Sequence, residues 1–347
     1  AAAAAVGAIH ALLGEPVAHV TLDLPGEKQV SFDLARCERD ERRVTCSTIK
    51  DAGDDPDVTH GAEICATVAW SAAPGITLAG GEGVGVVTRP GLPVPVGEPA
   101  INPGARRLIV QAAQQAAGPA LTTHGLHITI SVPRGQDIAQ ETLNPRLGIV
   151  GGISILGASG IVRPYSNASY RATIRLALAV AHKSGQRQAV LSTGKRSEEY
   201  AQQRYPAWSE LSFVQVGDHM DYALAQARRL GFSEIVIATM IGKASKLAQG
   251  RLQTHVSEGT VDLDFLARVA GELGAGLDLQ AAMRAANTAH HAQSLARRAG
   301  IEGLEQRVAE LAAGQAGAAL RPGAVIEVLI HSLDGALLGV ARRGGQR

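Results

Sequence analysis

The second half of the chain alternates short apolar runs with segments of helical spacing, and this alternation restricts the fold more than any other feature. Three aliphatic runs predict strands at 188–191, 212–216 and 234–238. The segments that follow them predict helices that begin at Arg196 and cover 220–230 and 244–248. Parallel strands need such crossover helices. The pattern therefore predicts a doubly wound, Rossmann-like α/β domain over residues 167–347.

A helix at 170–182 is predicted before this alternation, and a largely helical region is predicted after it. The later helices are expected at 263–273, 279–298 and 304–312. Two further apolar runs, at 324–331 and 337–341, predict late strands that complete the sheet.

The first half differs, because turns and prolines separate its strand-like runs. These runs predict a β-hairpin about Pro25–Gly26 and strands at 42–49, 62–70, 76–78 and 127–132. Helices are expected at the alanine-rich start, 1–13, and at 106–117, where Arg106 and Arg107 would occupy the first turn. Residues 1–166 are thus predicted to form a strand-rich, irregular α+β domain.

Charge is nearly balanced, with 33 Lys and Arg against 32 Asp and Glu, and aromatic residues make up only 3%. Nucleic-acid-binding proteins usually carry a basic face or aromatic stacking residues, so we expect no nucleic-acid partner. No apolar run reaches the ~18 residues that a membrane helix needs, so we expect no membrane partner. The start lacks the basic region of a signal peptide. These features predict a cytoplasmic protein and leave homo-oligomerisation open.

The cysteines Cys37, Cys46 and Cys65 are odd in number and form no C-x-x-C pair. This usage is typical of reduced thiols in the cytoplasm. We expect each of them to be a small buried apolar residue.

Small residues follow three of the predicted strands. Ligands of open parallel sheets bind beyond the carboxyl ends of the strands, where glycine permits close approach and helix N-termini offer free amides. The sequence therefore predicts a nucleotide-like or adenosyl ligand at turns formed by Thr193, Gly194, Gly217, Asp218, Gly242 and Lys243. Asp218 would contact a ribose diol. The alternative is that these glycines only end strands and start helices.

Four carboxylates crowd into residues 51–57, beside Lys50 and His60. Crowding raises the pKa of some carboxylates and attracts a proton, a metal or a cationic ligand, although a solvated turn has the same composition. Asp54, Asp55 and His60 are candidates for proton transfer, and so is His255 downstream, which is either a neutral base or a structural residue. The pair at 290–291 has no partner at helical spacing, so we expect no metal.

A glycine-rich apolar stretch at 143–166 joins the two halves, and arginine–proline corners flank it. Glycine lets a backbone or a ligand approach more closely than a Cβ would allow. The stretch predicts a wall for a flat or anionic ligand, or else a junction whose glycines only permit tight packing. The earlier pattern Gly81-x-Gly83-x-Gly85 is not a dinucleotide loop, because the residues after it continue as a strand.

Four long motifs resemble those of one protein family. They are KDAGDDPDVTHG at 50–61, GVGVVTRPGLPVPVGEPAINP at 83–103, TLNPRLGIVGGISILGASGIVRPYS at 142–166 and GKASKLAQGRLQTH at 242–255. The likeness is to the CbiD family, the cobalt-precorrin-5B C(1)-methyltransferases of anaerobic cobalamin biosynthesis, and covers nearly the whole chain. The family's T-T-G-x-C/S motif precedes the alanine run with which this sequence begins. The segment VGDHMDYAL at 216–224 also departs from the more apolar family version.

The resemblance implies transfer of a methyl group from S-adenosyl-L-methionine to C-1 of a small-molecule corrinoid, cobalt-precorrin-5B, to give cobalt-precorrin-6A. Corrinoid precursors carry several carboxylates, which scattered arginines bind well. The expected corrinoid-binding residues are Arg89, Arg106, Arg107, Arg146, Gly151, Gly152 and Arg163. We expect the second domain to bind the methyl donor, the first to hold the corrinoid, and transfer to occur between them. Alternatives are a nicotinamide-dependent corrinoid reductase and a non-catalytic corrinoid carrier.

Overall fold

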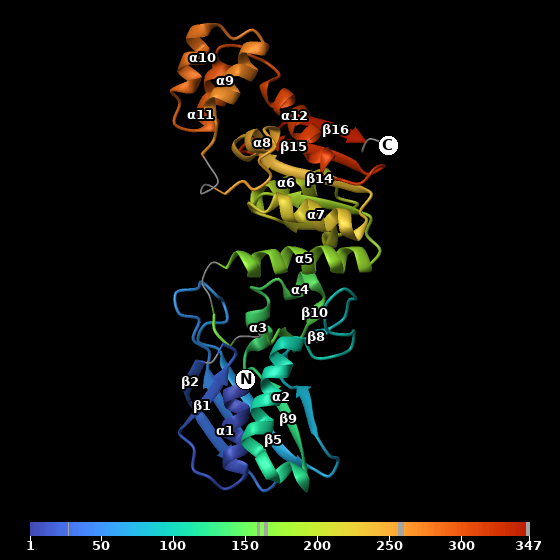
Figure 1. The fold of residues 1–347 in the computed structure, drawn as a ribbon. Coiled ribbons are helices and arrows are strands. Elements are labelled where there is room, and N and C mark those ends of the chain that lie inside the picture. Colours follow the sequence, from blue (N-terminus) through green and yellow to red (C-terminus); the bar gives the residue numbers. More distant parts are fainter. Residues whose placement is uncertain (27, 158–159, 163–165, 256–259, 345–347) are drawn as a thin grey trace. The chain divides into compact units, whose positions relative to one another are not determined.

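The computed structural model describes the chain except residues 27, 158–159, 163–165, 256–259 and 345–347, and it describes only the backbone of Lys28. The chain forms two compact units, Ala1–Ser166 and Asn167–Arg347 (Figure 1). The first is strand-rich and the second contains a parallel-strand sheet, as the sequence predicts.

The first unit is built on a five-stranded sheet of order β3-β4-β5-β9-β6. The strands are β3 (Arg36–Arg39), β4 (Arg43–Ile49), β5 (Glu63–Ser71), β9 (Gly125–Ser131) and β6 (Ile76–Gly80). Neighbours are antiparallel except β6, which runs parallel to β9. The predicted hairpin is confirmed as β1 (His19–Leu24) and β2 (Lys28–Asp33).

Two helices, α1 (Ala2–Leu12) and α2 (Pro103–Ala117), pack against each other and form the core of this unit with the sheet. Eight successive residues of α1 are buried, because its alanines are small enough for close approach on every side. Helix α2 starts three residues earlier than expected, since Asn102 caps it and Pro103 suits its first position. Arg106 and Arg107 therefore lie beyond the first turn, which corrects the predicted position.

The expectation of three separate buried thiols is wrong. Cys37 and Cys46 are directly opposite each other on β3 and β4 and form a disulfide, and Cys37 is exposed. Residues opposite each other on antiparallel strands bring their Cβ atoms within bridging reach. Cys65 remains a free, buried thiol. In a reducing compartment the bridged pair would be two neighbouring thiols.

Short strands join the two glycine-rich segments of the first unit. β8 (Val86–Val87) pairs antiparallel with β10 (Ile149–Val150), and β7 (Gly83–Val84) pairs parallel with β11 (Gly152–Ile153). The intervening elements are η1 (Gly118–Thr122), α3 (Gly135–Ala139) and α4 (Asn144–Leu147). The residues after Gly85 continue as strand, as expected, and do not open a helix.

The second unit contains a five-stranded sheet of order β13-β12-β14-β15-β16. The strands are β12 (Gln188–Ser192), β13 (Phe213–Gln215), β14 (Glu234–Met240), β15 (Val325–His331) and β16 (Leu337–Gly344). The first four run parallel, and β16 is antiparallel to β15 because a short turn connects them. The alternating strands and helices confirm the predicted element order.

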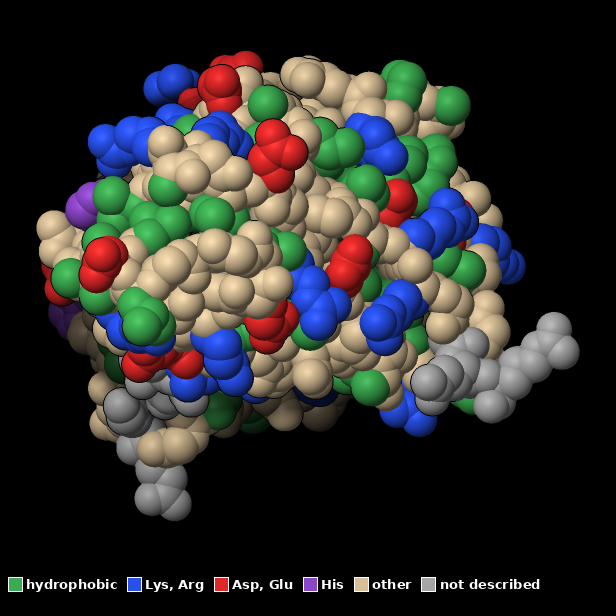
Figure 2. Space-filling model, turned by 90° about the horizontal axis from the view of Figure 1, so that it is seen from above, with side chains coloured by type: hydrophobic (Ala, Val, Ile, Leu, Met, Phe, Trp, Pro, Cys, Tyr) green, Lys and Arg blue, Asp and Glu red, His purple; other side chains and the backbone are tan. Residues whose placement is uncertain are grey.

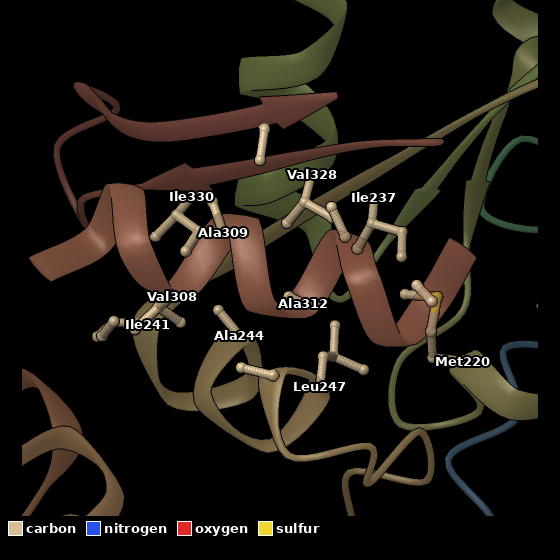
Figure 3. Close-up of a cluster of buried hydrophobic side chains, with 14 of the residues drawn as sticks. Met220, Ile237, Ile241, Ala244, Leu247, Val308, Ala309, Ala312, Val328 and Ile330 are labelled. Atoms are coloured by element: carbon tan, nitrogen blue, oxygen red, sulfur yellow. The ribbon is translucent and has the colours of Figure 1, made fainter. Parts of the chain in front are cut away.

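Helices cover both faces of this sheet. On one face, α5 (Asn167–Lys183), α7 (Met220–Leu230), α8 (Ile241–Ala248) and α12 (Leu304–Ala318) enclose the main core. Figure 3 shows Ile237 and Val328 from the strands among the side chains of α8 and α12. On the other face, α6 (Lys195–Arg204) covers a smaller cluster that includes Val190 and Val236, and η2 (Glu210–Ser212) precedes β13. Successive strand residues thus face opposite cores.

A group of helices lies between α8 and α12 in the sequence: α9 (Leu263–Glu272), α10 (Leu277–Arg284) and α11 (Ala289–Arg298). The single helix predicted at 279–298 is therefore wrong. The chain breaks because Thr288 caps a new helix, its hydroxyl accepting a hydrogen bond from the His291 amide at 3.1 Å. None of the helices in the described residues is both long and apolar enough to cross a bilayer. Acidic and basic side chains are interspersed on the face seen in Figure 2.

Candidate functional site

Lys243 joins the two loops that follow β12 and β13 at the carboxyl ends of the parallel strands. Its Nζ lies 3.0 Å from the carbonyl oxygen of Thr193, 3.4 Å from that of Gly217 and 3.1 Å from Asp218 Oδ1. Gly194 precedes α6 beside Thr193, and Gly242 precedes Lys243 in α8. The structure therefore brings the six predicted ligand-binding positions to one edge of the sheet.

One detail of that prediction is wrong. Gly242 and Lys243 do not form a turn, because β14 ends at Met240 and α8 begins at the next residue. They occupy the first turn of α8, from which Lys243 reaches the neighbouring strand ends.

Asp218 is held by partners within the protein. Thr254 Oγ1 donates to Asp218 Oδ1 at 2.7 Å, and Lys243 pairs with the same oxygen. Partial burial alone would raise the pKa of Asp218, but these hydrogen bonds and the positive charge of Lys243 outweigh it and lower the pKa. The charge of His255 acts in the same direction, so this candidate base lies near Asp218. The carboxylate therefore stabilises the loop arrangement, whether or not it also meets a ligand.

A cavity of about 400 Å³ opens beside this cluster, at the ends of β14 and β15. We call it the β14/β15 cavity. Its lining includes Gly242 and Lys246 of α8, Thr288 and His290 from the start of α11, His331 at the end of β15 and Leu333 after it. Its described lining contains no Asp or Glu. The cavity is thus partly apolar, and the ionisable side chains of its described lining are lysine and histidine.

His331 is the functional candidate that the sequence analysis missed. It is only 4% exposed, its Nδ1 has no hydrogen-bond partner in the described structure, and its ring lies 5.4 Å from the Tyr200 ring. Burial, together with the charge of Arg204, lowers its pKa and keeps it neutral. Its position at the end of a predicted strand was the one feature of the sequence that could have pointed to it, and that position alone indicates neither its burial nor its missing partner.

The polar turn of the first unit is organised by Lys50. Its Nζ contacts Asp57 Oδ2 and Thr59 Oγ1, and Thr59 Oγ1 also donates to Asp57 Oδ1 at 2.6 Å. Burial favours a raised pKa for Asp57, but the hydrogen bonds from Lys50 and Thr59 outweigh it and lower the pKa. Asp57 is therefore not one of the carboxylates whose pKa crowding raises, because Lys50 and Thr59 stabilise its charged form.

The three predicted catalytic residues of this turn are less constrained. Asp54 is exposed, Asp55 is half-buried, and His60 is exposed while its Nδ1 accepts the Ala52 amide at 3.1 Å. A neutral imidazole that accepts at Nδ1 carries its proton on Nε2. In the described part of the chain, no group of three or more His, Cys, Asp or Glu side chains is placed to hold a metal ion.

The glycines of 143–166 have different surroundings. A Cβ at Gly152 would lie 2.1 Å from the Gly83 carbonyl oxygen, so Gly152 permits contact between two backbones. Gly151 has φ +85° and open space around it. The buried Asn144 fixes the same segment, since its amide donates to the Gly152 carbonyl at 3.0 Å and its Oδ1 accepts from Ser154. Only Gly151 of the two predicted glycines leaves backbone open to a ligand.

The side chains of three predicted arginines make no ion pair or hydrogen bond with any residue that the structure describes: Arg89, Arg106 and Arg107. The stem of Arg89 packs against Gly148, where a Cβ would lie 2.5 Å from its Cγ. Arg146 is half-buried in α4 nearby, and Arg163 lies outside the described residues. An arginine without a protein partner retains all its donors for an anion.

Comparison with known families covers both units. The family model named CbiD matches residues 1–164, and the model of the CbiD C-terminal domain matches residues 253–342. The chain belongs to the CbiD family. This confirms the resemblance carried by the four motifs.

Several curated relatives of this CbiD chain carry the name cobalt-precorrin-5B C(1)-methyltransferase. The protein of Geobacillus thermodenitrificans is 45% identical over 342 residues, which covers 98% of this chain and 92% of the relative. That of Salinispora arenicola is 48% identical over 304 residues, covering 87% and 80%. A crystal structure described as cobalamin biosynthesis protein (cbiD) from Archaeoglobus fulgidus is 27% identical, with 74% and 80% of the chains covered and a TM-score of 0.39.

Proposed function

We propose that this chain is a methyltransferase that uses S-adenosyl-L-methionine to methylate C-1 of cobalt-precorrin-5B, giving cobalt-precorrin-6A in cobalamin biosynthesis. The observation that carries the proposal is the 45% identity over 342 residues to a protein named for that activity. As a step in the biosynthesis of a small molecule, the reaction is expected to take place in the cytoplasm, without nucleic acid or membrane. Whether the chain acts as a homo-oligomer is left open.

The reaction is a displacement at a methyl group, and the protein contributes mainly by positioning. The carbon–carbon bond forms as the carbon–sulfur bond breaks, the sulfur leaves as a neutral thioether, and the macrocycle releases a proton. The protein must therefore hold two ligands in line and offer a proton acceptor.

For the donor, we propose the carboxyl edge of the second unit, as a doubly wound, Rossmann-like domain. In support, the strand order β13-β12-β14-β15 reverses between β12 and β14, which is where such sheets bind ligands. A Cβ at Gly194 would meet nothing within 4 Å, so a ligand has room against this backbone. The donor edge would comprise Thr193, Gly194, Gly217, Asp218, Gly242 and Lys243.

For the corrinoid, we propose the first unit. The guanidinium groups of Arg89, Arg106 and Arg107 have no partner among the described residues, which supports this, because a substrate with several carboxylates needs separate guanidinium groups. Arg146, Arg163, Gly151 and Gly152 complete the proposed set.

Four residues remain proposed proton acceptors: Asp54, Asp55, His60 and His255. His255 is favoured, because it lies near Asp218 at the proposed donor edge. His60 is less favoured, since its Nδ1 lone pair is already occupied.

The test is to incubate the purified protein with cobalt-precorrin-5B and methyl-¹³C-labelled S-adenosylmethionine. We expect a corrinoid that is heavier by one labelled methyl group, together with S-adenosylhomocysteine. Consumption of reduced nicotinamide cofactor would instead identify a reductase, and corrinoid binding without any turnover or donor binding would identify a carrier. Replacing Arg89, Arg106 and Arg107 by Gln is expected to weaken corrinoid binding and leave donor binding intact.

A further inference from the structure

Tyr170, near the start of α5, lies over the loop that follows β13. A Cβ built at Gly217 would lie 2.9 Å from the Tyr170 hydroxyl oxygen, so this hydroxyl occupies the space beside the glycine. The Tyr170 ring also packs against the ring of the buried His219, with 5.3 Å between the centroids. The two contacts fix the phenol at the proposed donor edge.

The hydroxyl of Tyr170 makes no hydrogen bond with any described residue, and the residue is 40% exposed. By contrast, the hydroxyls of Tyr200 and Tyr205 both donate to acceptors within the protein. A tyrosine hydroxyl can donate one hydrogen bond and accept others. Tyr170 therefore has both capacities available for a ligand.

The carboxylate of Asp218, the residue after Gly217, has one oxygen available. Thr254 and Lys243 both contact Oδ1, whereas Oδ2 accepts no hydrogen bond from a described residue. Asp218 is ionised near neutral pH, because these contacts outweigh the effect of partial burial and lower its pKa. Burial and the nearby carboxylates of Asp218 and Glu198 raise the pKa of Tyr170, so the phenol keeps its proton.

An ionised carboxylate and a protonated phenol at one loop suit a ligand with two adjacent hydroxyls. One hydroxyl can donate to the carboxylate while the other accepts from the phenol. Carboxylates beyond the strand ends of doubly wound sheets bind ribose hydroxyls in this way. The adenosyl group of the proposed methyl donor has such a diol at its 2′ and 3′ carbons.

We propose that Tyr170 and Asp218 together bind the ribose diol of the methyl donor, one hydroxyl donating to Asp218 Oδ2 and the other accepting from the Tyr170 hydroxyl. This rests on the proposed methyltransferase function and adds Tyr170 to its donor edge. It also gives Gly217 a role, because any side chain there would displace the Tyr170 hydroxyl.

The experiment is calorimetric titration of the full chain with S-adenosylhomocysteine and with its 2′-deoxy and 3′-deoxy analogues. Tyr170→Phe removes only a hydroxyl without a described protein partner, so the melting temperature should not change. The substitution should weaken binding of S-adenosylhomocysteine by about three- to tenfold, through loss of one hydrogen bond. For one of the two deoxy analogues it should cause no further loss, because the hydroxyl that Tyr170 contacts is already absent.

Tyr222→Phe is the matched control. The hydroxyl of Tyr222 likewise has no hydrogen-bond partner among the described residues, and its ring packs against the guanidinium of Arg171 at 5.6 Å. This variant should bind all three ligands as the unaltered protein does.

The outcomes separate this assignment from the proposed function. Normal binding by Tyr170→Phe overturns the assignment and leaves a methyltransferase whose donor does not contact this residue. Equal weakening for all three ligands also overturns it, because Tyr170 would then contact another part of the donor, such as the adenine edge. If the unaltered protein binds neither S-adenosylhomocysteine nor S-adenosylmethionine, the donor chemistry itself is wrong and the assignment falls with it. Should Tyr170→Phe unfold, ¹³C-tyrosine resonances of the unaltered protein decide: an unmoved Tyr170 signal on ligand binding overturns the assignment.

Discussion

Arg134 has φ 61° and is the one non-glycine residue with positive φ in the described structure. L-residues reach this left-handed conformation at a free-energy cost of roughly 1–2 kcal/mol. The surrounding backbone imposes it, because Gly135 packs against Gly83 with 2.2 Å between its would-be Cβ and the Gly83 carbonyl oxygen. The strain is confined to this residue, so a residue that adopts the left-handed conformation freely should relieve it.

Arg134→Gly is expected to stabilise the protein by about 1 kcal/mol, since relief of the left-handed strain exceeds the added entropy of the unfolded chain. Urea denaturation measures this. Arg134→Ala removes the same side chain but keeps the left-handed strain, so it should not raise the free energy of unfolding. Equal stabilisation by both variants would show that the guanidinium, not the backbone, is responsible.

Lys50 and Asp57 provide a pH-dependent contribution to stability. The pKa of Asp57 is lower in the folded chain than in the unfolded one, so its contribution is fully present above the unfolded pKa of about 4 and is lost as pH falls through the folded pKa. Lys50→Met should lower the free energy of unfolding at pH 7 by about 1–2 kcal/mol. The difference between variant and parent should shrink below about pH 4. Lys195→Met, at an exposed ion pair on α6, should have little effect at either pH.

At the scale of elements, the glycine-rich strands β7 and β11 meet backbone to backbone. Gly152→Ala should therefore lower the free energy of unfolding by roughly 2–3 kcal/mol or more, because its Cβ would overlap the Gly83 carbonyl. Gly151 faces open space, so Gly151→Ala should lower the free energy of unfolding by only about 1–2 kcal/mol, the cost of a positive φ for alanine. Thermal melting of the two single variants checks the order. A milder effect at Gly152 would mean that the two segments are not in this contact.

Elements with strong periodicity were predictable, and their junctions were less so. The strand at β14 and the helix at α7 follow from local patterns alone, because β14 is a continuous buried apolar run and the buried residues of α7 recur at helical spacing. The break at Thr288 depends on a cap that competes with continued helix, and the bridge between Cys37 and Cys46 depends on strand register. Strand register is settled by tertiary contacts, which a local pattern does not contain, whereas the Thr288 cap is a local contact that competed with an equally local helical pattern.

The candidate site was also predictable only in part from the sequence. Thr193, Gly217 and Lys243 were predictable as strand-end residues, but their common contact at one ammonium was not. Nothing in a local motif distinguishes His331 from an ordinary strand residue, since its burial and its missing partner arise from α6, α11 and β15 together. Arg89, Arg106 and Arg107 were chosen for charge, while their lack of protein partners required the fold.

At the scale of the whole molecule, each unit buries its own apolar core. The core of residues 1–166 forms around α1 and the mixed sheet, and that of 167–347 forms around the parallel sheet. A unit with a core of its own is expected to fold alone. A fragment of residues 167–347 should therefore melt cooperatively, as monitored by near-ultraviolet circular dichroism. A fragment with helical signal but no cooperative transition would show that its core needs the first unit.

Lys243 contacts the carbonyl oxygens of Thr193 and Gly217 on two loops, and its one side-chain partner, Asp218, follows Gly217 on the second loop. Main-chain oxygens are present whatever residue is encoded, so Lys243 places no requirement on the side chain at Thr193, whose hydroxyl instead donates to Thr239 Oγ1 at 3.0 Å. The carboxylate at Asp218 and the hydroxyl at Thr254 have no such freedom. In an alignment of CbiD sequences, positions 218, 243 and 254 should change together, while position 193 varies independently of them.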